Sequence, residues 1–201
     1  MKRFLFAIAI LLPLLMLSAC KPAPPVAPPP AEPAAVVLTN ADGALSEAEL
    51  ERVRTFAEQQ LNVRVLAAGG SLAAASLAEA VAQTDEIKAV RSPVEIVICE
   101  LAGEEEHILI DAQAGLAAIN TVPLKIDDAE KYARRVERLV MRAVGTLAGL
   151  GFDPDPFCVM HSYETVADLD RMGRNFSPPW QQKFARAAAE MGLEPREPQL
   201  N

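Results

Sequence analysis

Histidine and cysteine, two residue types that often carry catalysis or bind metals, are rare in this sequence. It contains two histidines, His107 and His161, and three cysteines. His107 follows three glutamates and is expected at the surface or at a sheet edge. His161 directly follows Cys158-Val159-Met160, and a lone histidine of this kind is more often a hydrogen-bonded structural residue than a catalyst. Ser162 is its neighbour in sequence, but adjacency does not establish the geometry of a catalytic triad.

The cysteines give little support for a thiolate metal site. Cys20 belongs to an N-terminal pattern, which leaves Cys99 and Cys158. Two thiols without a C-x-x-C pair cannot make a cysteine-based zinc site. In an oxidising compartment the two can form a disulfide, but two buried free thiols are equally compatible with the sequence.

Three arginines, Arg135, Arg138 and Arg142, are spaced i, i+3 and i+7 and therefore share one flank of a helix. We expect this flank to be solvated and paired with the abundant acidic side chains. The alternative is that Arg142 lies in a cleft beside His161 and binds a carboxylate of a peptide or of a cell-wall stem. The acidic run 104–106 is expected in a solvated turn, because adjacent acids without further ligands make a weak divalent-ion site.

The N-terminus predicts export and lipidation. Basic residues precede an apolar run, Phe4 to Leu17, that is too short to span a bilayer comfortably. The run ends in the letters LSAC, which resemble a bacterial lipobox whose cysteine is Cys20. Residues 1–19 are therefore expected to be a signal peptide, and Cys20 is expected to be lipidated. The alternatives are an uncleaved anchor helix or a signal peptide that is cut elsewhere.

Lipidation at Cys20 predicts a protein anchored in a membrane of the bacterial cell envelope. Lys21 stands where an aspartate would retain such a protein in the inner membrane, so the outer membrane, facing the periplasm, is favoured. Residues 20–40 are assigned to the lipidated cysteine and a proline-rich spacer, since proline fixes its own φ and lacks a donor. The folded domain is expected over 41–194 and a flexible tail over 195–201.

The formal net charge of −8 at pH 7 argues against a nucleic-acid partner. The expected partners are the membrane, through the lipid anchor, and an envelope peptide or protein. The chain after the spacer is long enough for one domain with a substantial core.

Periodicity and capping signals predict a single α/β domain with a mixed sheet packed against helices. The expected elements, in order, are a helix after Ser46, a strand at 62–68, a helix at 71–83, strands at 93–101, 107–111 and 116–122, a helix at about 129–148, a short helix at 165–171 and a last helix capped by Ser177. Gly69-Gly70 is expected to interrupt the chain between the first strand and the second helix.

The segment from Ala112 to Trp180 resembles the archaemetzincins, a family of metzincin-clan zinc metallopeptidases. The resemblance rests on "AQAGLAAINTVPLK", on Gly149-Leu150-Gly151, on Cys158-Val159-Met160 and on "ADLDRMGRNF". It implies a metzincin-like mixed sheet, a catalytic helix that carries H-E-x-x-H-x-x-G-x-x-H, and a second zinc site made of cysteines.

Aligned on Gly149-Leu150-Gly151, the residues of the family's catalytic site are all replaced. The first histidine falls on Arg142, the glutamate on Ala143, the second histidine on Thr146 and the third on Phe152. Arginine is a permanent cation where a cation should bind, and alanine cannot act as the general base. The resemblance therefore implies a domain that has no metal or other cofactor and no zinc peptidase mechanism at this site.

The second zinc site is replaced in the same way. Its four thiolate positions fall on Asp153, Cys158, Ser177 and Trp180, of which only Cys158 keeps a thiol. The sequence thus predicts a catalytically inactive archaemetzincin-like domain that acts as a binding or scaffold module. The alternative is a peptidase or other hydrolase that uses a non-standard site on the same fold.

Overall fold

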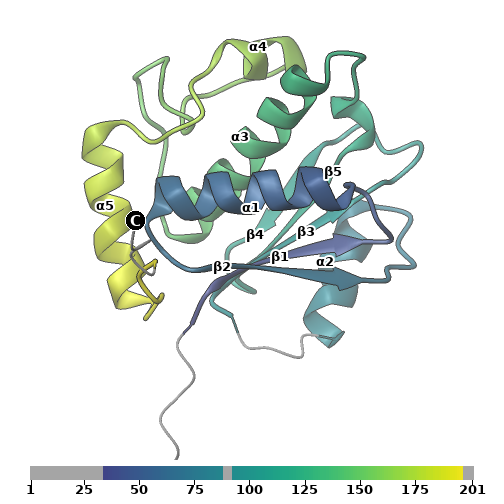
Figure 1. Ribbon diagram of the computed structural model, residues 1–201, viewed down its shortest axis with the longest axis horizontal. Helices are drawn as coiled ribbons and strands as arrows, with labels where there is room; N and C mark the ends of the chain where they lie inside the picture. Colours follow the sequence, from purple (N-terminus) through teal and green to yellow (C-terminus); the bar gives the residue numbers. More distant parts are fainter. Residues whose placement is uncertain (1–33, 88–91, 197–201) are drawn as a thin grey trace, which may run out of the picture. The chain divides into compact units, whose positions relative to one another are not determined.

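The computed structural model describes residues 34–87 and 92–196, which form an α/β unit around a five-stranded sheet (Figure 1). Cys20 and the predicted signal peptide lie outside these residues. The strand order is β2-β1-β3-β5-β4. The strands are β1 (Val36–Ala41), β2 (Val65–Gly70), β3 (Val94–Cys99), β4 (Ile108–Asp111) and β5 (Leu116–Asn120). β4 runs antiparallel to β5 and every other pair is parallel, so the predicted mixed sheet is confirmed.

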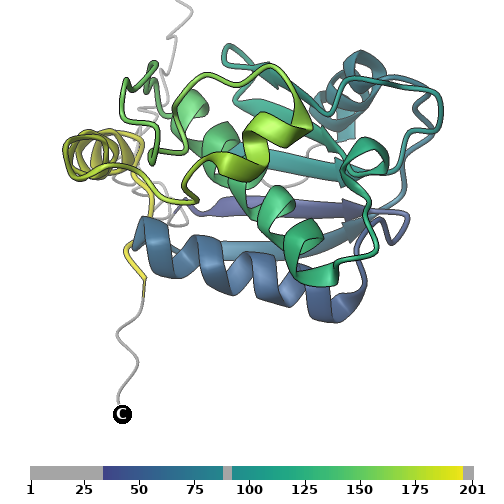
Figure 2. The ribbon, with the colours of Figure 1, turned by 90° about the horizontal axis from the view of Figure 1, so that it is seen from above.

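Helices cover both faces of the sheet. They are α1 (Glu47–Leu61), α2 (Leu77–Ile87), α3 (Ala129–Leu147), α4 (Val166–Arg171) and α5 (Pro178–Glu190), with a short 3-10 turn η1 at Val122–Leu124. Figure 2 shows α1 and α2 on opposite sides of the sheet. In the described part of the chain, no helix combines the length and the apolar character needed to cross a membrane.

Alternate side chains of the strands point to the two faces and build two apolar clusters. Ile96 and Ile98 of β3 join the larger cluster with Val140 of α3. Val97 joins the smaller cluster with Leu77 of α2. The buried sheet therefore fixes the position of α3, the helix that carries the candidate site.

The folded unit is longer at both ends than the sequence predicted. β1 lies within the range that was assigned to the spacer, yet it pairs with both β2 and β3. The predicted tail also begins too early, since the amide of Arg196 donates to the carbonyl of Asn62 (3.2 Å). The amide of Glu194 donates to the carbonyl of Ala34 (2.7 Å), so the last described segment fastens the chain just before β1.

The prediction that Gly69 and Gly70 end the strand before them is wrong. Gly69 and Gly70 are the last residues of β2 and pair with Asn40 and Ala41 of β1. They are exposed at the sheet edge, where the absence of a side chain costs no packing. The helix that was expected to begin directly after them begins only at Leu77.

Local capping signals explain where the site helix begins and ends. The side chain of Asp128 accepts from the amide of Lys131 at the start of α3. Gly149 follows the helix with a φ of 76°, a conformation that glycine adopts without strain. The amide of Leu150 then bonds the carbonyl of Gly145 (2.9 Å), which closes the helix end. The predicted span of about 129–148 is thereby confirmed.

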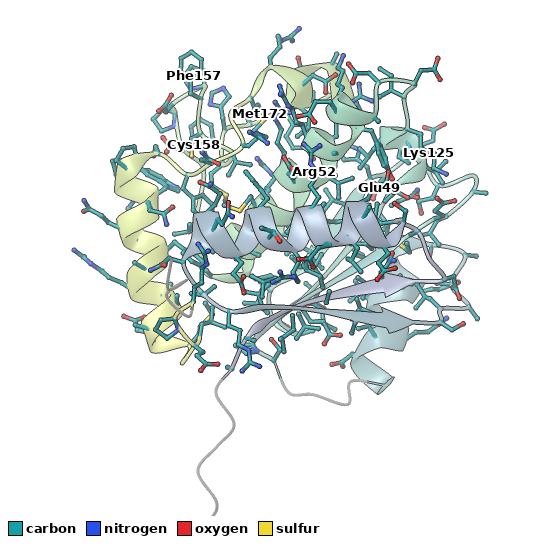
Figure 3. The ribbon with its side chains drawn as sticks, viewed as in Figure 1. Glu49, Arg52, Lys125, Phe157, Cys158 and Met172 are labelled. Carbon is teal, nitrogen blue, oxygen red and sulfur yellow. The ribbon has the colours of Figure 1, made fainter. Side chains whose placement is uncertain are left out.

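The segment between α3 and α5 is held in one conformation by its own backbone bonds. The amide of Phe157 donates to Asp155 Oδ1 (2.9 Å), and the amide of Cys158 donates to the Asp155 carbonyl (3.0 Å). Gly173 packs so closely against the Phe157 carbonyl that a β-carbon at that position would collide with it. Figure 3 shows Phe157 at the outer edge of this segment and Cys158 beneath it.

Replacing Gly173 by alanine is expected to destabilise the protein by about 2 kcal/mol or more, because the new β-carbon overlaps backbone that cannot rotate away. The measurement is the free energy of unfolding in urea. Gly69→Ala is the matched control, since a β-carbon there meets open space, and it should leave stability unchanged or raise it by up to about 1 kcal/mol. Equal effects of the two substitutions would contradict the packing of Gly173 on Phe157.

Candidate functional site

Arg142 ties α3 to the segment that follows the helix. Its Nη1 donates to the carbonyls of Val159 (3.0 Å) and His161 (2.7 Å). Its guanidinium carbon lies 4.9 Å from the centre of the Tyr163 ring, in the range of a cation–π contact. Thr146 is one helical turn further on the same flank and is half-buried. The position that the resemblance assigns to the first metal-binding histidine therefore holds a cation that bonds backbone carbonyls.

The electrostatics around Arg142 are unusual for an acidic protein. Among the described residues, its contacts are two carbonyls and a tyrosine ring, and they include no carboxylate. Burial lowers the pKa of Arg142, although the group stays charged at any physiological pH. Burial raises the pKa of Tyr163, an effect that the charge of Arg142 opposes. The site therefore presents a half-buried positive charge.

His107, which immediately precedes the edge strand β4, also contacts Tyr163. Its Nε2 is 2.8 Å from the hydroxyl of Tyr163, and the two rings are 5.5 Å apart. Burial lowers the pKa of His107, so the neutral form is favoured. The edge position was predicted, since His107 immediately precedes β4. Its contact with Tyr163 was not predicted, because the two residues are distant in sequence and no local pattern links them.

Phe152 and His161 meet directly. Their ring centres are 5.5 Å apart, and the Phe152 side chain remains 58% exposed. His161 Nδ1 lies 3.0 Å from the carbonyl of Asp153. A carbonyl only accepts, so this contact places the imidazole proton on Nδ1. Arg142 and Phe152, which the resemblance aligns with two metal ligands, thus both contact His161, whose own ring is hydrogen-bonded to backbone.

Ala143 offers no group that catalysis could use. Its methyl group is fully buried in the larger apolar cluster. A methyl group neither accepts a proton nor orients a water molecule. The position that the resemblance assigns to the general base is therefore part of the core.

A second cluster forms where the resemblance placed cysteines. The Ser177 hydroxyl donates to Asp153 Oδ2, and the Ser177 amide donates to Cys158 Sγ (3.3 Å). Trp180 lies beside them, its indole N–H bonded to the carbonyl of Gly151 (2.9 Å). Ser177 is the N-cap residue of α5, as predicted, but its hydroxyl bonds Asp153 and makes no capping bond within the helix. Hydrogen bonds therefore connect Asp153, Cys158 and Ser177, whereas Trp180 bonds Gly151.

Burial and hydrogen-bond donors set the pKa values of Asp153 and Cys158 in this cluster. Burial alone would raise the pKa of Asp153, but hydrogen bonds from Ser177 and from the Asp155 amide outweigh it and leave the pKa below its usual value. Burial raises the pKa of Cys158, an effect that two backbone amides partly oppose. Asp153 is thus a carboxylate, and Cys158 is a thiol, at neutral pH.

The donor sets of the two clusters do not fit zinc. Structural and catalytic zinc take three or four ligands from cysteine, histidine or carboxylate side chains. The positions that the resemblance assigns to the catalytic zinc, Arg142, Thr146 and Phe152, offer a cation, a hydroxyl and a phenyl ring. The second cluster offers Asp153 and Cys158 alone, both already hydrogen-bonded. In residues 34–87 and 92–196, no three histidine, cysteine or acidic side chains converge on one point.

The two domain cysteines are separate free thiols. Cys99 lies in the smaller apolar cluster and Cys158 in the larger one, on opposite faces of the sheet. Burial raises the pKa of Cys99 to about 11. Of the two possibilities that the sequence left open, the structure therefore has buried thiols.

The arginine flank of α3 is not solvated, which corrects the sequence prediction. Arg135 and Arg138 are each 7% exposed. Arg135 donates to the Leu124 carbonyl (2.8 Å) and to the Asp170 carboxylate. Arg138 donates to the carbonyls of Met172 (3.0 Å) and Asp170 (3.2 Å). The irregular chain beside α3 has carbonyls with no regular partner, and the arginines supply the donors.

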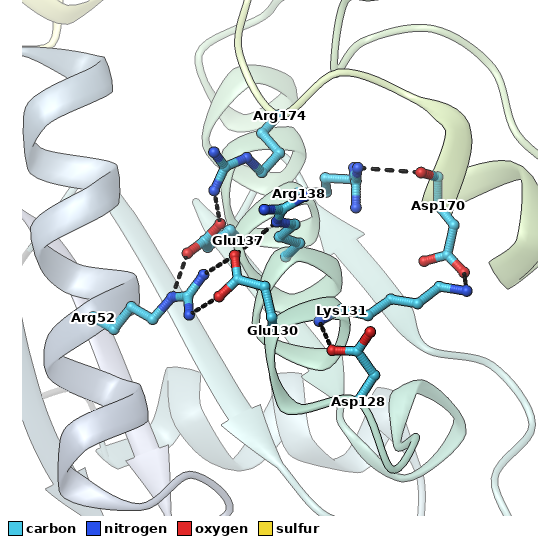
Figure 4. A network of polar contacts seen from close by, with 9 residues as sticks. Arg52, Asp128, Glu130, Lys131, Glu137, Arg138, Asp170 and Arg174 are labelled. Carbon is cyan, nitrogen blue, oxygen red and sulfur yellow. Dashed lines mark hydrogen bonds and ion pairs between the residues drawn. The ribbon is translucent and has the colours of Figure 1, made fainter.

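A buried carboxylate completes this polar layer on the neighbouring flank. Glu137 is 1% exposed and accepts from Arg52 of α1 (3.0 Å) and from Arg174 (2.6 Å). Arg52 also forms a paired contact with Glu130 (2.6 and 3.0 Å). Figure 4 shows Arg52 and Arg174 directed toward Glu137, with Glu130 beside Arg52. Charge spacing along the sequence gave no signal for this network.

Comparison with solved structures decides the fold. An archaemetzincin from Methanopyrus kandleri is 21% identical, with a TM-score of 0.64 over 80% of this chain and 98% of that one. A zinc-dependent peptidase from Methanocorpusculum labreanum is 14% identical, with a TM-score of 0.61 over 74% of this chain and 99% of that one. This chain has the archaemetzincin fold. An archaemetzincin from Archaeoglobus fulgidus, in complex with malonate, is 15% identical, with a TM-score of 0.58 over 73% of this chain and 98% of that one.

The likeness to archaemetzincins is found by comparing structures and not by comparing sequences. No protein-family model matches the sequence, and no curated protein matches it. The predicted metzincin-like sheet packed against helices is confirmed, and the likeness extends well beyond the segment from Ala112 to Trp180 that suggested it.

Replacing Arg142 by methionine keeps the apolar stem but removes the donors to two carbonyls. The Val159 carbonyl belongs to a fully buried residue, and leaving it without a donor should lower the free energy of unfolding by about 2 kcal/mol or more. Urea unfolding followed by circular dichroism measures this loss. Arg134→Met is the control, because Arg134 is exposed and bonds Glu130 on the same helix, and its effect should stay within about 0.5 kcal/mol. Similar losses in both variants would refute the role of Arg142.

Proposed function

We propose that this chain is a catalytically inactive protein of archaemetzincin fold that acts as a binding or scaffold module, anchored to the bacterial envelope by a lipid on Cys20. The observation that carries the proposal is the state of Arg142. The sequence resemblance aligns Arg142 with the first zinc-binding histidine, and its guanidinium contacts two carbonyls and a tyrosine ring.

The described residues also give no support for a hydrolase that works without zinc. A nucleophilic mechanism needs a serine or cysteine within hydrogen-bond reach of a base. Among the described hydrogen bonds, His107 contacts Tyr163 and His161 contacts the Asp153 carbonyl. Neither histidine is bonded to a serine or a cysteine side chain in these residues. These contacts favour the inactive module over a hydrolase with a non-standard site.

The free edge of the sheet supports a binding role. β4 is the last strand in the order, so its outer edge presents backbone donors and acceptors to an added strand. His107 precedes β4 and connects through Tyr163 to Arg142. An extended peptide that lies along β4 would reach this positive charge with a carboxylate. The ligand class that fits is therefore a peptide of the envelope with an acidic group.

The proposal predicts that the protein from Lys21 onward contains no stoichiometric zinc and does not cleave casein when zinc is supplied. Zinc content is measured by mass spectrometry after dialysis against a zinc buffer. The triple variant Arg142→His, Thr146→His, Phe152→His is the positive control, because these substitutions return three nitrogen donors to the cleft. Its fold is checked by circular dichroism.

One zinc ion per chain in the unmodified protein would overturn the proposal, and so would zinc-dependent cleavage of casein. Zinc in the triple variant alone would show that the geometry persists and that only the ligands are lost.

The anchor is tested separately from the cleft. Cells that express the full chain are fed an alkyne analogue of palmitate, and the protein is then coupled to a fluorophore. The wild-type chain should be labelled, and Cys20→Ala should lose the label, because the thiol receives the diacylglycerol group. Cys99→Ala, which removes a buried thiol of the domain, should keep it. Equal labelling of Cys20→Ala and the wild type would refute the lipoprotein proposal and leave the zinc result untouched.

A further inference from the structure

Exposed aromatic side chains are concentrated on one loop. Of the four large hydrophobic side chains exposed in the described residues, Leu66 and Ile126 lie elsewhere, and Phe152 and Phe157 flank the sequence Asp153 to Pro156. Phe157 is 78% exposed. Figure 3 shows it projecting from the outer edge of the molecule. Single exposed hydrophobics are ordinary, whereas two phenylalanines on one short loop mark an interaction surface.

The loop presents Phe157 on a rigid backbone. Asp155 receives the amides of Phe157 and Cys158, and two prolines restrict the chain between the phenylalanines. The Phe157 carbonyl is pressed against Gly173. A side chain that is already fixed loses little entropy when it is buried by a partner, which is the property of an interface anchor.

A hollow lies directly beside this anchor. It has a volume of about 530 Å³ and is lined by Pro156, His161, Tyr163 and Met172, with Glu164 and Arg171 among its charged residues. Pro156 is the residue before Phe157, so the protrusion and the hollow share one surface. The lining combines Pro156, Tyr163 and Met172 with polar and charged side chains, and the volume is ample for a phenyl ring.

We propose that this surface pairs two copies of the chain, with Phe157 of each copy inserted into the hollow of the other. A protrusion and a hollow side by side on one surface are self-complementary under a two-fold axis, the commonest symmetry of protein dimers. The same contact buries two phenylalanine anchors in one step, since each copy supplies one.

The charges at the hollow fit the same arrangement. Glu164 is exposed, and the side chain of Arg171 is 74% exposed although it contacts Asp168. A two-fold axis can place Glu164 of one copy opposite Arg171 of the other, twice. The chain as a whole carries a net charge of −8, which disfavours contact between copies elsewhere on its surface. A patch that carries charges of both signs reduces that repulsion locally.

The test is sedimentation velocity on the chain from Lys21 to Asn201, at protein concentrations from about 1 μM to 1 mM, the range expected of a small interface. The wild type should pass from monomer to dimer in this range. Phe157→Ala should raise the dimer Kd about 100-fold, roughly tenfold for each of the two anchors. Ile126→Ala removes an exposed hydrophobic residue elsewhere and should leave the Kd unchanged.

A charge exchange separates this interface from a general loss of solubility or fold. Arg171→Glu alone should weaken the dimer, because two Glu164 contacts become repulsive. Adding Glu164→Arg should restore it, since opposite charges face each other again. A wild type that stays monomeric at 1 mM would overturn the proposal, as would a dimer that Phe157→Ala leaves intact. Monomeric protein that binds phosphatidylglycerol vesicles through Phe157 would assign the surface to lipid and would overturn it too.

Discussion

Bonds from arginine guanidinium groups hold together the part of this molecule that carries the candidate site. The chain between α3 and α5 is mostly irregular, and its carbonyls need donors that no strand or helix provides. Arg138 and Arg142 bring those donors from one flank of α3, and Arg135 on the same flank binds the Asp170 carboxylate of this segment. The segment is therefore attached to the helix by arginine side chains, which stay charged at physiological pH and need no metal ion.

Side-chain hydrogen bonds also connect the chain at both places where the archaemetzincin likeness implies zinc. Arg142 connects α3 to the segment that follows it, a link that a metal ion could also make. Beside it, Asp153, Cys158 and Ser177 share hydrogen bonds in a buried cluster. At both places a hydrogen-bonded contact connects separate parts of the chain. The fold is thus held there by bonds that do not require a metal ion.

The sequence predicted those parts of the fold that depend on local signals. The limits of α3 follow from Asp128 and Gly149, which act on their neighbours alone. The sequence did not reveal what covers a helix flank: the spacing of Arg135 and Arg138 shows that they share a side, but the segment that buries them comes from some thirty residues downstream. β1 was missed because a short apolar run beside prolines gives no sign that two strands will enclose it. Comparison of structures found the archaemetzincin fold because the arrangement of strands and helices can be kept when the residues of a sequence motif differ.

The way the chain enters the folded unit has a mechanical consequence. β1 is bonded along both of its edges, and Ala34 just before it is held by Glu194. A pull on the preceding residues acts along the strand, so the bonds of both ladders are loaded in shear and must yield together. Unzipping one bond at a time would need a force across the strand instead. A domain suspended by this end would therefore resist tension at its strongest point.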